Sequence, residues 1–192
     1  MGPPGSPGGT RGNHTRVIPV RYHTGVLVTV DPAIRADRDA LRRLVMDGFA
    51  GVDGAHVEVL VERARRRQDS FTGRAYSRPP RSLLVAADTR YLVRLRVPGT
   101  LRNRGYPLTQ RYPRRKTAPW ITVATWSERL VSLAAHEACH VRQFREGLRR
   151  SEVEAERWAL RLLQDWVTVQ SPSPRIVSTE PRSQQLALFA TG

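Results

Sequence analysis

Residues 136–140 read His-Glu-Ala-Cys-His, and this spacing constrains the chain more than any other feature of it. On an α-helix, residues four apart lie on one face, so both imidazoles can reach one metal ion with the Glu137 carboxylate beside them. The flanks predict such a helix, because Thr125 and Glu128 form a capping box and Gly147 supplies a stop. Apolar residues recur between them at helical spacing, at Leu130, Leu133, Ala134, Val141 and Phe144.

The pentapeptide alone fits two interpretations, a metal site or an ordinary amphipathic helix with two solvated histidines. A catalytic zinc needs a third protein ligand and an open position for water. The next acidic residues are Glu152, Glu154 and Glu156, in a second helix that Ser151 and Glu154 are expected to cap. Glu152 and Glu156 share a helical face. A simple hairpin turning near 147–150 would place Glu156 opposite His140, so the spacing leaves both residues open as the third ligand.

This second helix resembles that of the gluzincin metallopeptidases. Residues 152–159 read Glu-Val-Glu-Ala-Glu-Arg-Trp-Ala, similar to the pattern that follows HExxH in ImmA/IrrE-type and HtpX-type members. The resemblance covers about residues 120–165 and implies a Zn²⁺-dependent endopeptidase. In it His136, His140 and Glu152 bind zinc, Glu156 supports a ligand, and residues 120–124 pair with the substrate backbone. Only eleven residues separate His140 from Glu152, a spacing closer to SprT-like proteases, which use a third histidine there.

The expected chemistry is hydrolysis of a peptide bond. Zinc lowers the pKa of water toward neutrality, and Glu137 takes the proton as the oxygen attacks the carbonyl and can then deliver it to the leaving amine. Cys139 is expected to be a small buried filler rather than a ligand. Tyr106, Tyr112 and several arginines are equally eligible to stabilise the oxyanion.

The net charge of +15 favours polyanionic partners such as nucleic acid. Two long basic segments, 63–81 and 98–119, carry interleaved aromatic residues, so each is either a nucleic-acid contact or a solvated surface loop. One cysteine excludes an intrachain disulfide framework. No apolar run approaches a membrane span and the first 25 residues lack the apolar stretch of a signal peptide, so a cytoplasmic protein without a membrane partner is expected.

The chain is expected to hold one domain of α+β class at residues 14–168, flanked by disordered tails at 1–13 and 169–192. The domain is predicted to be a small mixed β-sheet followed by the active-site helix and a second helix, as in a minimal gluzincin-like zincin. Strands are predicted at 17–22, 26–30, 57–61, 83–86, 91–97 and 120–124, with 83–86 and 91–97 forming a hairpin. Helices are predicted at about 32–47, 125–147 and 151–167.

The C-terminal tail contains Gln185-Leu186-Ala187-Leu188-Phe189, which resembles the peptide by which bacterial DNA polymerases and repair proteins bind the sliding clamp. The resemblance implies that Leu188 and Phe189 fill an apolar pocket of the clamp while Gln185 hydrogen-bonds at its rim, with Leu186 as part of the motif. The alternative is an apolar tail that folds back onto its own domain. A protease with this tail and charge would act at DNA. The alternative functions are a non-catalytic, metal-stabilised DNA- or clamp-binding module, or a regulator that cleaves one dedicated repressor.

Overall fold

The computed structural model describes residues 20–21, 25–65, 71–110 and 118–170, and these form an α+β fold. Their main sheet has the strand order β1-β2-β3-β5-β4. Strands β2 (Leu27–Val30), β3 (Val57–Arg63) and β5 (Tyr91–Val97) run parallel. The edge strands β1 (Val20–Arg21) and β4 (Thr72–Tyr76) are antiparallel to their neighbours. The predicted class, a small mixed sheet followed by two helices, is confirmed.

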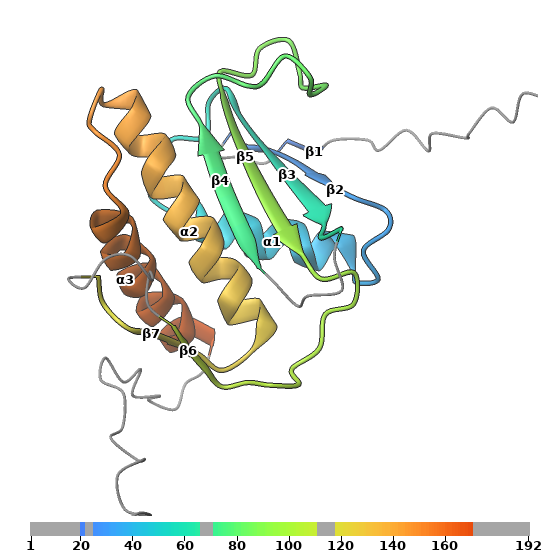
Figure 1. Cartoon of the computed structure of the whole chain (residues 1–192), viewed down its shortest axis with the longest axis vertical. Helices are drawn as coiled ribbons and strands as arrows, with labels where there is room; N and C mark the ends of the chain where they lie inside the picture. Colours follow the sequence, from blue (N-terminus) through green and yellow to red (C-terminus); the bar gives the residue numbers. More distant parts are fainter. Residues whose placement is uncertain (1–19, 22–24, 66–70, 111–117, 171–192) are drawn as a thin grey trace, which may run out of the picture.

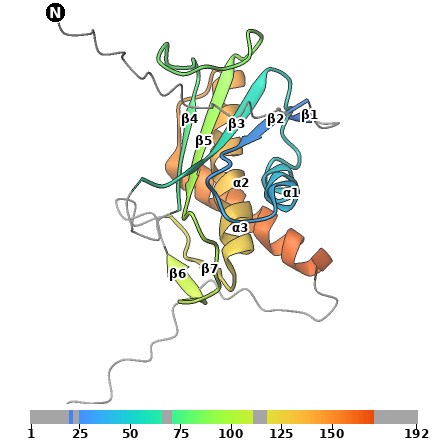
Figure 2. The same ribbon diagram turned by 90° about the vertical axis from the view of Figure 1, so that its right-hand side faces the viewer.

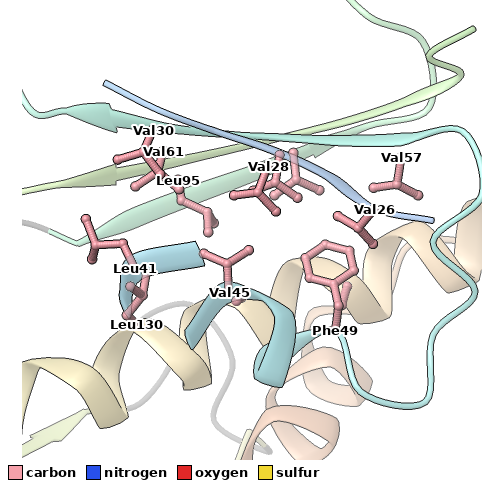
Figure 3. Close-up of a cluster of buried hydrophobic side chains, with 14 of the residues drawn as sticks. Val26, Val28, Val30, Leu41, Val45, Phe49, Val57, Val61, Leu95 and Leu130 are labelled. Carbon is pink, nitrogen blue, oxygen red and sulfur yellow. The ribbon is translucent and has the colours of Figure 1, made fainter. Parts of the chain in front are cut away.

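Helices α1 (Arg38–Gly48) and α2 (Trp126–Arg145) cover one face of this sheet, and α3 (Glu152–Gln170) packs along α2 (Figures 1 and 2). The sheet residues that face the helices alternate along each strand, as the period of a β-strand requires. Figure 3 shows the resulting core, in which valines of β2 and β3 meet Leu41 and Val45 of α1 and Leu130 of α2. Gly48 lets α1 and α2 cross closely, because a Cβ there would lie 2.4 Å from the Ala134 Cβ.

A second, smaller core lies beneath α3. It joins a two-stranded sheet, β6 (Leu108–Gln110) with β7 (Ile121–Val123), to apolar residues of α2 and α3. Its most buried members are Ile121, Val123, Ala135, Ala159 and Leu163. The HExxH helix is therefore held on one side by the large sheet and on the other by α3. Within the described residues, no helix combines the length and apolar composition needed to cross a bilayer.

Two predictions about the N-terminal half are wrong. The first helix does not begin at Asp31 and Pro32, since Asp31 accepts a hydrogen bond from the Ala33 N–H in a turn and α1 is capped by Asp37. The predicted hairpin partner at 83–86 is not a strand. The strand that pairs with β5 is instead β4, which lies inside the segment 63–81 that was expected to be a loop.

The ends of α2 follow the sequence prediction. The Thr125 hydroxyl accepts from the Glu128 N–H at 3.1 Å, and the Glu128 carboxylate accepts from the Ala124 N–H at 2.6 Å. Gly147 takes a positive φ of 66°, the conformation that ends a helix in a Schellman turn. The turn is closed by the Leu148 N–H on the Gln143 carbonyl at 2.8 Å. It brings α3 back toward α2 within a few residues.

Candidate metal centre

Three side-chain atoms of α2 and α3 converge on one point. His136 Nε2 lies 3.1 Å from His140 Nε2, and Glu152 Oε2 lies 3.2 Å and 3.3 Å from these two nitrogens. In a tetrahedral zinc site with ligand distances of about 2.0–2.2 Å, neighbouring ligand atoms are about 3.3–3.6 Å apart. The observed separations lie at or just below this range. Two imidazole nitrogens and one carboxylate oxygen are also donors that zinc accepts, so the residues fit a zinc ion.

The other nitrogen of each imidazole is held by a neighbouring side chain. His140 Nδ1 lies 2.9 Å from Gln143 Oε1, and His136 Nδ1 lies 3.3 Å from Glu156 Oε1. An amide or carboxylate oxygen accepts, so each Nδ1 carries the proton and each Nε2 lone pair is left for a metal. The structure therefore brings Glu152 to the two Nε2 atoms and Glu156 to the back of His136.

Gln143, which was not predicted as a site residue, connects the two helices. Its buried amide oxygen also accepts from the Ser151 N–H at 3.1 Å, and its amide nitrogen donates to the Glu154 carboxylate at 2.9 Å. These bonds fix the start of α3, whose first residue is Glu152. The spacing offers a signal, because a residue three positions after His140 on a helix lies within reach of its Nδ1.

The two Glu152 oxygens have different partners. Oε2 faces the histidines, whereas Oε1 accepts from the Arg150 guanidinium at 2.8 Å. The hydrogen bond to His136 lowers the pKa of Glu152 to about 2, and the charge of the Arg150 guanidinium acts in the same direction. Glu152 is therefore a carboxylate at any physiological pH. The acid expected to complete the Ser151 cap, Glu154, uses its carboxylate for Arg142 and Gln143 instead.

The two histidines titrate differently. Burial by itself lowers the pKa of His136, but its bonds to Glu152 and Glu156 outweigh this and raise the pKa to about 9. Burial lowers the pKa of His140, which is fully buried and stays neutral. Without a metal, a proton on His136 thus balances the Glu152 charge, so metal binding at this centre would displace a proton.

Glu137 lies on the neighbouring face of α2, beneath the edge strand β4. It is 2 % exposed, and burial raises the pKa of its carboxyl although the Ala75 N–H donates a hydrogen bond to it. Among the described residues, none hydrogen-bonds its Oε2 atom. A Cβ on Gly73 would lie 2.6 Å from the Glu137 Oε1, so β4 comes this close to the carboxylate only because residue 73 is glycine.

The strand beside Glu137 is therefore β4 and not residues 120–124, which were expected to line the cleft. Residues 121–123 form β7, which pairs with β6. Strand β4 is the last strand in the sheet order and runs alongside α2 (Figure 1). Because backbone groups alternate in direction along a strand, β4 directs every second N–H and C=O away from β5. This free edge borders the carboxylate.

The remaining predicted residues lie apart from this cluster or outside the described residues. Cys139 is fully buried, its pKa is raised to about 11 by burial, and it does not belong to the cluster of ligand atoms, as expected of a filler. Residues 169–170 of the predicted C-terminal tail belong to α3, which ends at Gln170. The rest of that tail, with Gln185, Leu186, Leu188 and Phe189, and the predicted tail 1–13 fall outside the described residues. Tyr112, one candidate for the oxyanion, also falls outside them.

Comparisons with models of protein families, with curated proteins and with solved structures return no match to this chain.

Proposed function

We propose that this chain is a cytoplasmic zinc-dependent endopeptidase with a gluzincin-like centre. The observation that carries the proposal is the convergence of His136, His140 and Glu152 beside a buried carboxylate oxygen of Glu137 that has no partner among the described residues. A structural zinc site would be completed by a fourth cysteine or histidine. Among the described residues, no such fourth ligand joins this cluster.

His136, His140 and Glu152 would hold the ion, with Glu156 and Gln143 orienting the two imidazoles. When bound, zinc supplies Lewis acidity and lowers the pKa of water toward neutrality. Glu137 then acts as the general base: its Oε2 takes a proton from the attacking water and later gives it to the leaving amine. A buried carboxyl with a raised pKa suits both steps, because it exchanges protons closer to neutral pH than an exposed glutamate does.

The free edge of β4 would hold the peptide in the cleft. An extended chain can add to a sheet edge through backbone hydrogen bonds, which do not depend on its sequence. Gly73 and Ala75 are the two residues of β4 that approach Glu137, so a peptide on this edge would present its carbonyl near that carboxylate. This arrangement supports an endopeptidase acting on extended or unfolded segments.

The test is the Glu137→Gln variant, assayed on an unfolded protein and for zinc content. We expect cleavage to fall by about 10²–10⁴-fold, because the general base is lost while the ligands remain. Zinc content should be unchanged. Glu146→Gln, at the exposed end of α2, is the matched control and should keep both properties. Undiminished cleavage by Glu137→Gln would contradict the proposal, whereas zinc binding without any cleavage by the unmodified chain would favour the non-catalytic module.

A sliding clamp remains the proposed partner of the C-terminal peptide, on the strength of its sequence alone. Leu188→Ala with Phe189→Ala should abolish capture of the chain by an immobilised bacterial clamp, because both anchors would be lost. Ser183→Ala, just upstream, is the control. Capture that is equal for the two variants, or absent from the unmodified chain, would contradict this partner.

A further inference from the structure

A cavity of about 620 Å³ lies at the start of α2, between the segment 98–108 and Phe71, the residue that precedes β4. We call it the basic pocket and define it by three aromatic and three basic residues of its lining, Phe71, Tyr106, Trp126, Arg102, Arg104 and Arg129. It plays no part in the metal centre. Most of these residues belong to the two basic segments 63–81 and 98–119, each of which is either a nucleic-acid contact or a solvated surface loop by its sequence.

The lining combines cations with flat rings. The Arg129 guanidinium lies 5.1 Å from the centre of the Phe71 ring, and Arg102 and Arg104 are exposed at the rim. Among the described residues that line the pocket, none is acidic, although the described chain pairs many of its other arginines with carboxylates. Three positive charges therefore lie at a concave surface to which the described part of the chain adds no counter-charge, and this favours an anionic ligand.

The rings narrow the choice of anion. An acidic peptide would use the arginines but would make no use of the aromatic lining of the pocket. A nucleotide uses both, because its base stacks on a ring while its phosphate meets a guanidinium, and a cavity of this volume can hold it. In a duplex the base faces are already stacked, so the base must come from a single strand.

A second hollow lies on the outer face of β4 and β5. It is smaller, about 180 Å³, and its lining includes Arg74, Arg94 and Arg96, the last two beside Glu62. Thr72 lines it and directly follows Phe71 of the basic pocket, so consecutive residues of the chain line the two hollows. A strand of nucleotides is long enough to reach both hollows, whereas a single nucleotide occupies one. We infer that the basic pocket binds single-stranded nucleic acid, with a base against Trp126 and phosphates on Arg102, Arg104 and Arg129.

The pocket lies on the two elements that frame Glu137. Arg129 precedes Glu137 by eight residues of α2, a rise of about 12 Å along the helix, and Phe71 is two residues before Gly73. If the proposed peptidase function holds, nucleic acid in the pocket would place a protein bound to it at the cleft. The substrate class would then be proteins attached to single-stranded DNA. This last step rests on the proposed function, whereas binding itself does not.

The first test measures binding of a fluorescent 12-nucleotide oligodeoxythymidine to the full chain by anisotropy, over a range of salt concentrations. Arg102→Ala with Arg104→Ala should weaken binding about tenfold or more and make the slope of log K against log salt shallower by about 1.4, since each phosphate contact contributes about 0.7. The matched control, Arg157→Ala with Arg161→Ala, removes the same charge from exposed positions of α3 and should change binding by less than about threefold. An equal loss of affinity for the oligonucleotide in the two double variants would overturn the inference.

The second test asks whether a base stacks in the pocket. The oligonucleotide should quench part of the tryptophan fluorescence, and Trp126→Phe should remove this part while affinity stays within about threefold, because phenylalanine preserves a ring surface. Unlabelled duplex of equal length and polyglutamate should compete at least tenfold more weakly than the single strand. Quenching that persists in Trp126→Phe would overturn the inference, as would polyglutamate that competes equally.

Neither measurement involves hydrolysis, so its failure leaves the proposed peptidase untouched. Conversely, failure of the Glu137→Gln test leaves this binding site untouched. The substrate class is tested by cleavage of a single-strand-binding protein, which oligodeoxythymidine should accelerate for the unmodified chain but not for Arg102→Ala with Arg104→Ala. Equal acceleration of cleavage in the unmodified chain and in the double variant would overturn the assigned substrate class.

Discussion

The metal centre and the basic pocket lie along the same helix but are built on opposite principles. In the metal centre each side chain is buried or nearly so and is oriented by a neighbour, as His140 is by Gln143 and Glu152 by Arg150. In the basic pocket Arg102 and Arg104 are exposed, and the Arg129 guanidinium lies over the Phe71 ring. The side chains of the metal centre are therefore oriented before a ligand binds. The basic pocket is defined mainly by which residue types line it.

This difference follows from what each site would have to do. Chemistry at a metal tolerates little misplacement, and orienting residues around the ligands maintain it. A polymer with repeating charge can be held by long side chains that adjust to it. Exposed charges are screened by salt, whereas buried ones are screened much less. The pocket should therefore respond to ionic strength and the metal centre should not.

The largest expected effect comes from removing a ligand. His140→Ala should abolish stoichiometric zinc binding, because only two of the three converging donors remain. Added zinc should then no longer raise the melting temperature of the variant, as measured by calorimetry with and without zinc. Affinity for oligodeoxythymidine should be unchanged, since the pocket is separate. Unchanged zinc-induced stabilisation of His140→Ala would contradict the assigned centre.

A smaller loss is expected when the link between the helices is cut. Gln143→Met keeps the size of the side chain but leaves the His140 Nδ1–H and the Ser151 N–H without their acceptor. Zinc affinity should fall about 10–100-fold, and the free energy of unfolding should fall by about 1–3 kcal/mol. Gln164→Met, on α3 away from the centre, is the control for both measurements. Equal zinc affinity for Gln143→Met and the control would show that Gln143 does not orient His140.

Crowding the cleft should separate catalysis from metal binding. Gly73→Ala would place a Cβ 2.6 Å from the Glu137 Oε1, so strand or carboxylate must shift. We expect cleavage to fall about 100-fold, the scale of a misplaced catalytic group, with zinc content unchanged. The control is Thr72→Ala, on the neighbouring exposed residue of β4. A fully active Gly73→Ala would argue against β4 as the wall of the cleft.

The smallest expected effect is a pH dependence of the metal-free protein. His136 has a folded pKa of about 9 against an unfolded value of 6.5. Its contribution to stability is therefore complete below about 6.5 and is lost as pH rises through 9. The melting temperature in chelator should fall over this interval, and the stabilisation by added zinc should grow over it, because zinc requires the neutral imidazole.

The control for this pH dependence is His56→Asn, at an exposed histidine that is not part of the centre, which should keep both trends. His136→Asn should flatten them. A metal-free protein whose melting temperature rises between pH 6.5 and 9 would contradict the assigned pairing of His136 with Glu152 and Glu156.

The parts that sequence could predict are those set by local spacing. The cap at Thr125, the stop at Gly147 and the apolar face of α2 all follow from residues within a few positions of one another. The hydrophobic alternation of β2, β3 and β5 is equally local. Proximity of Glu152 to the two histidines agrees with the family pattern, while the hairpin argument for Glu156 fails because the Gln143 bonds to Ser151 set where α3 starts.

The parts that sequence missed depend on distant partners. Strand β4 reads Thr-Gly-Arg-Ala-Tyr, which has little strand propensity, and it exists because β5 pairs with it. In sequence, Gly73 indicates a loop. In the structure it is a strand residue that must be glycine because the Glu137 carboxylate lies against it. The first helix is capped by Asp37 instead of starting near residue 32, because the bridge from Arg35 to Thr100 keeps the intervening chain extended.

Zinc stoichiometry by elemental analysis tests the central claim most directly, on the unmodified chain with Glu152→Ala and Glu156→Ala beside it. The geometry predicts about one zinc per chain, lost in Glu152→Ala and retained, with weaker affinity, in Glu156→Ala. Absence of zinc from the unmodified chain after zinc has been offered would contradict the metal centre. Loss in Glu156→Ala with retention in Glu152→Ala would contradict the assignment of its third ligand.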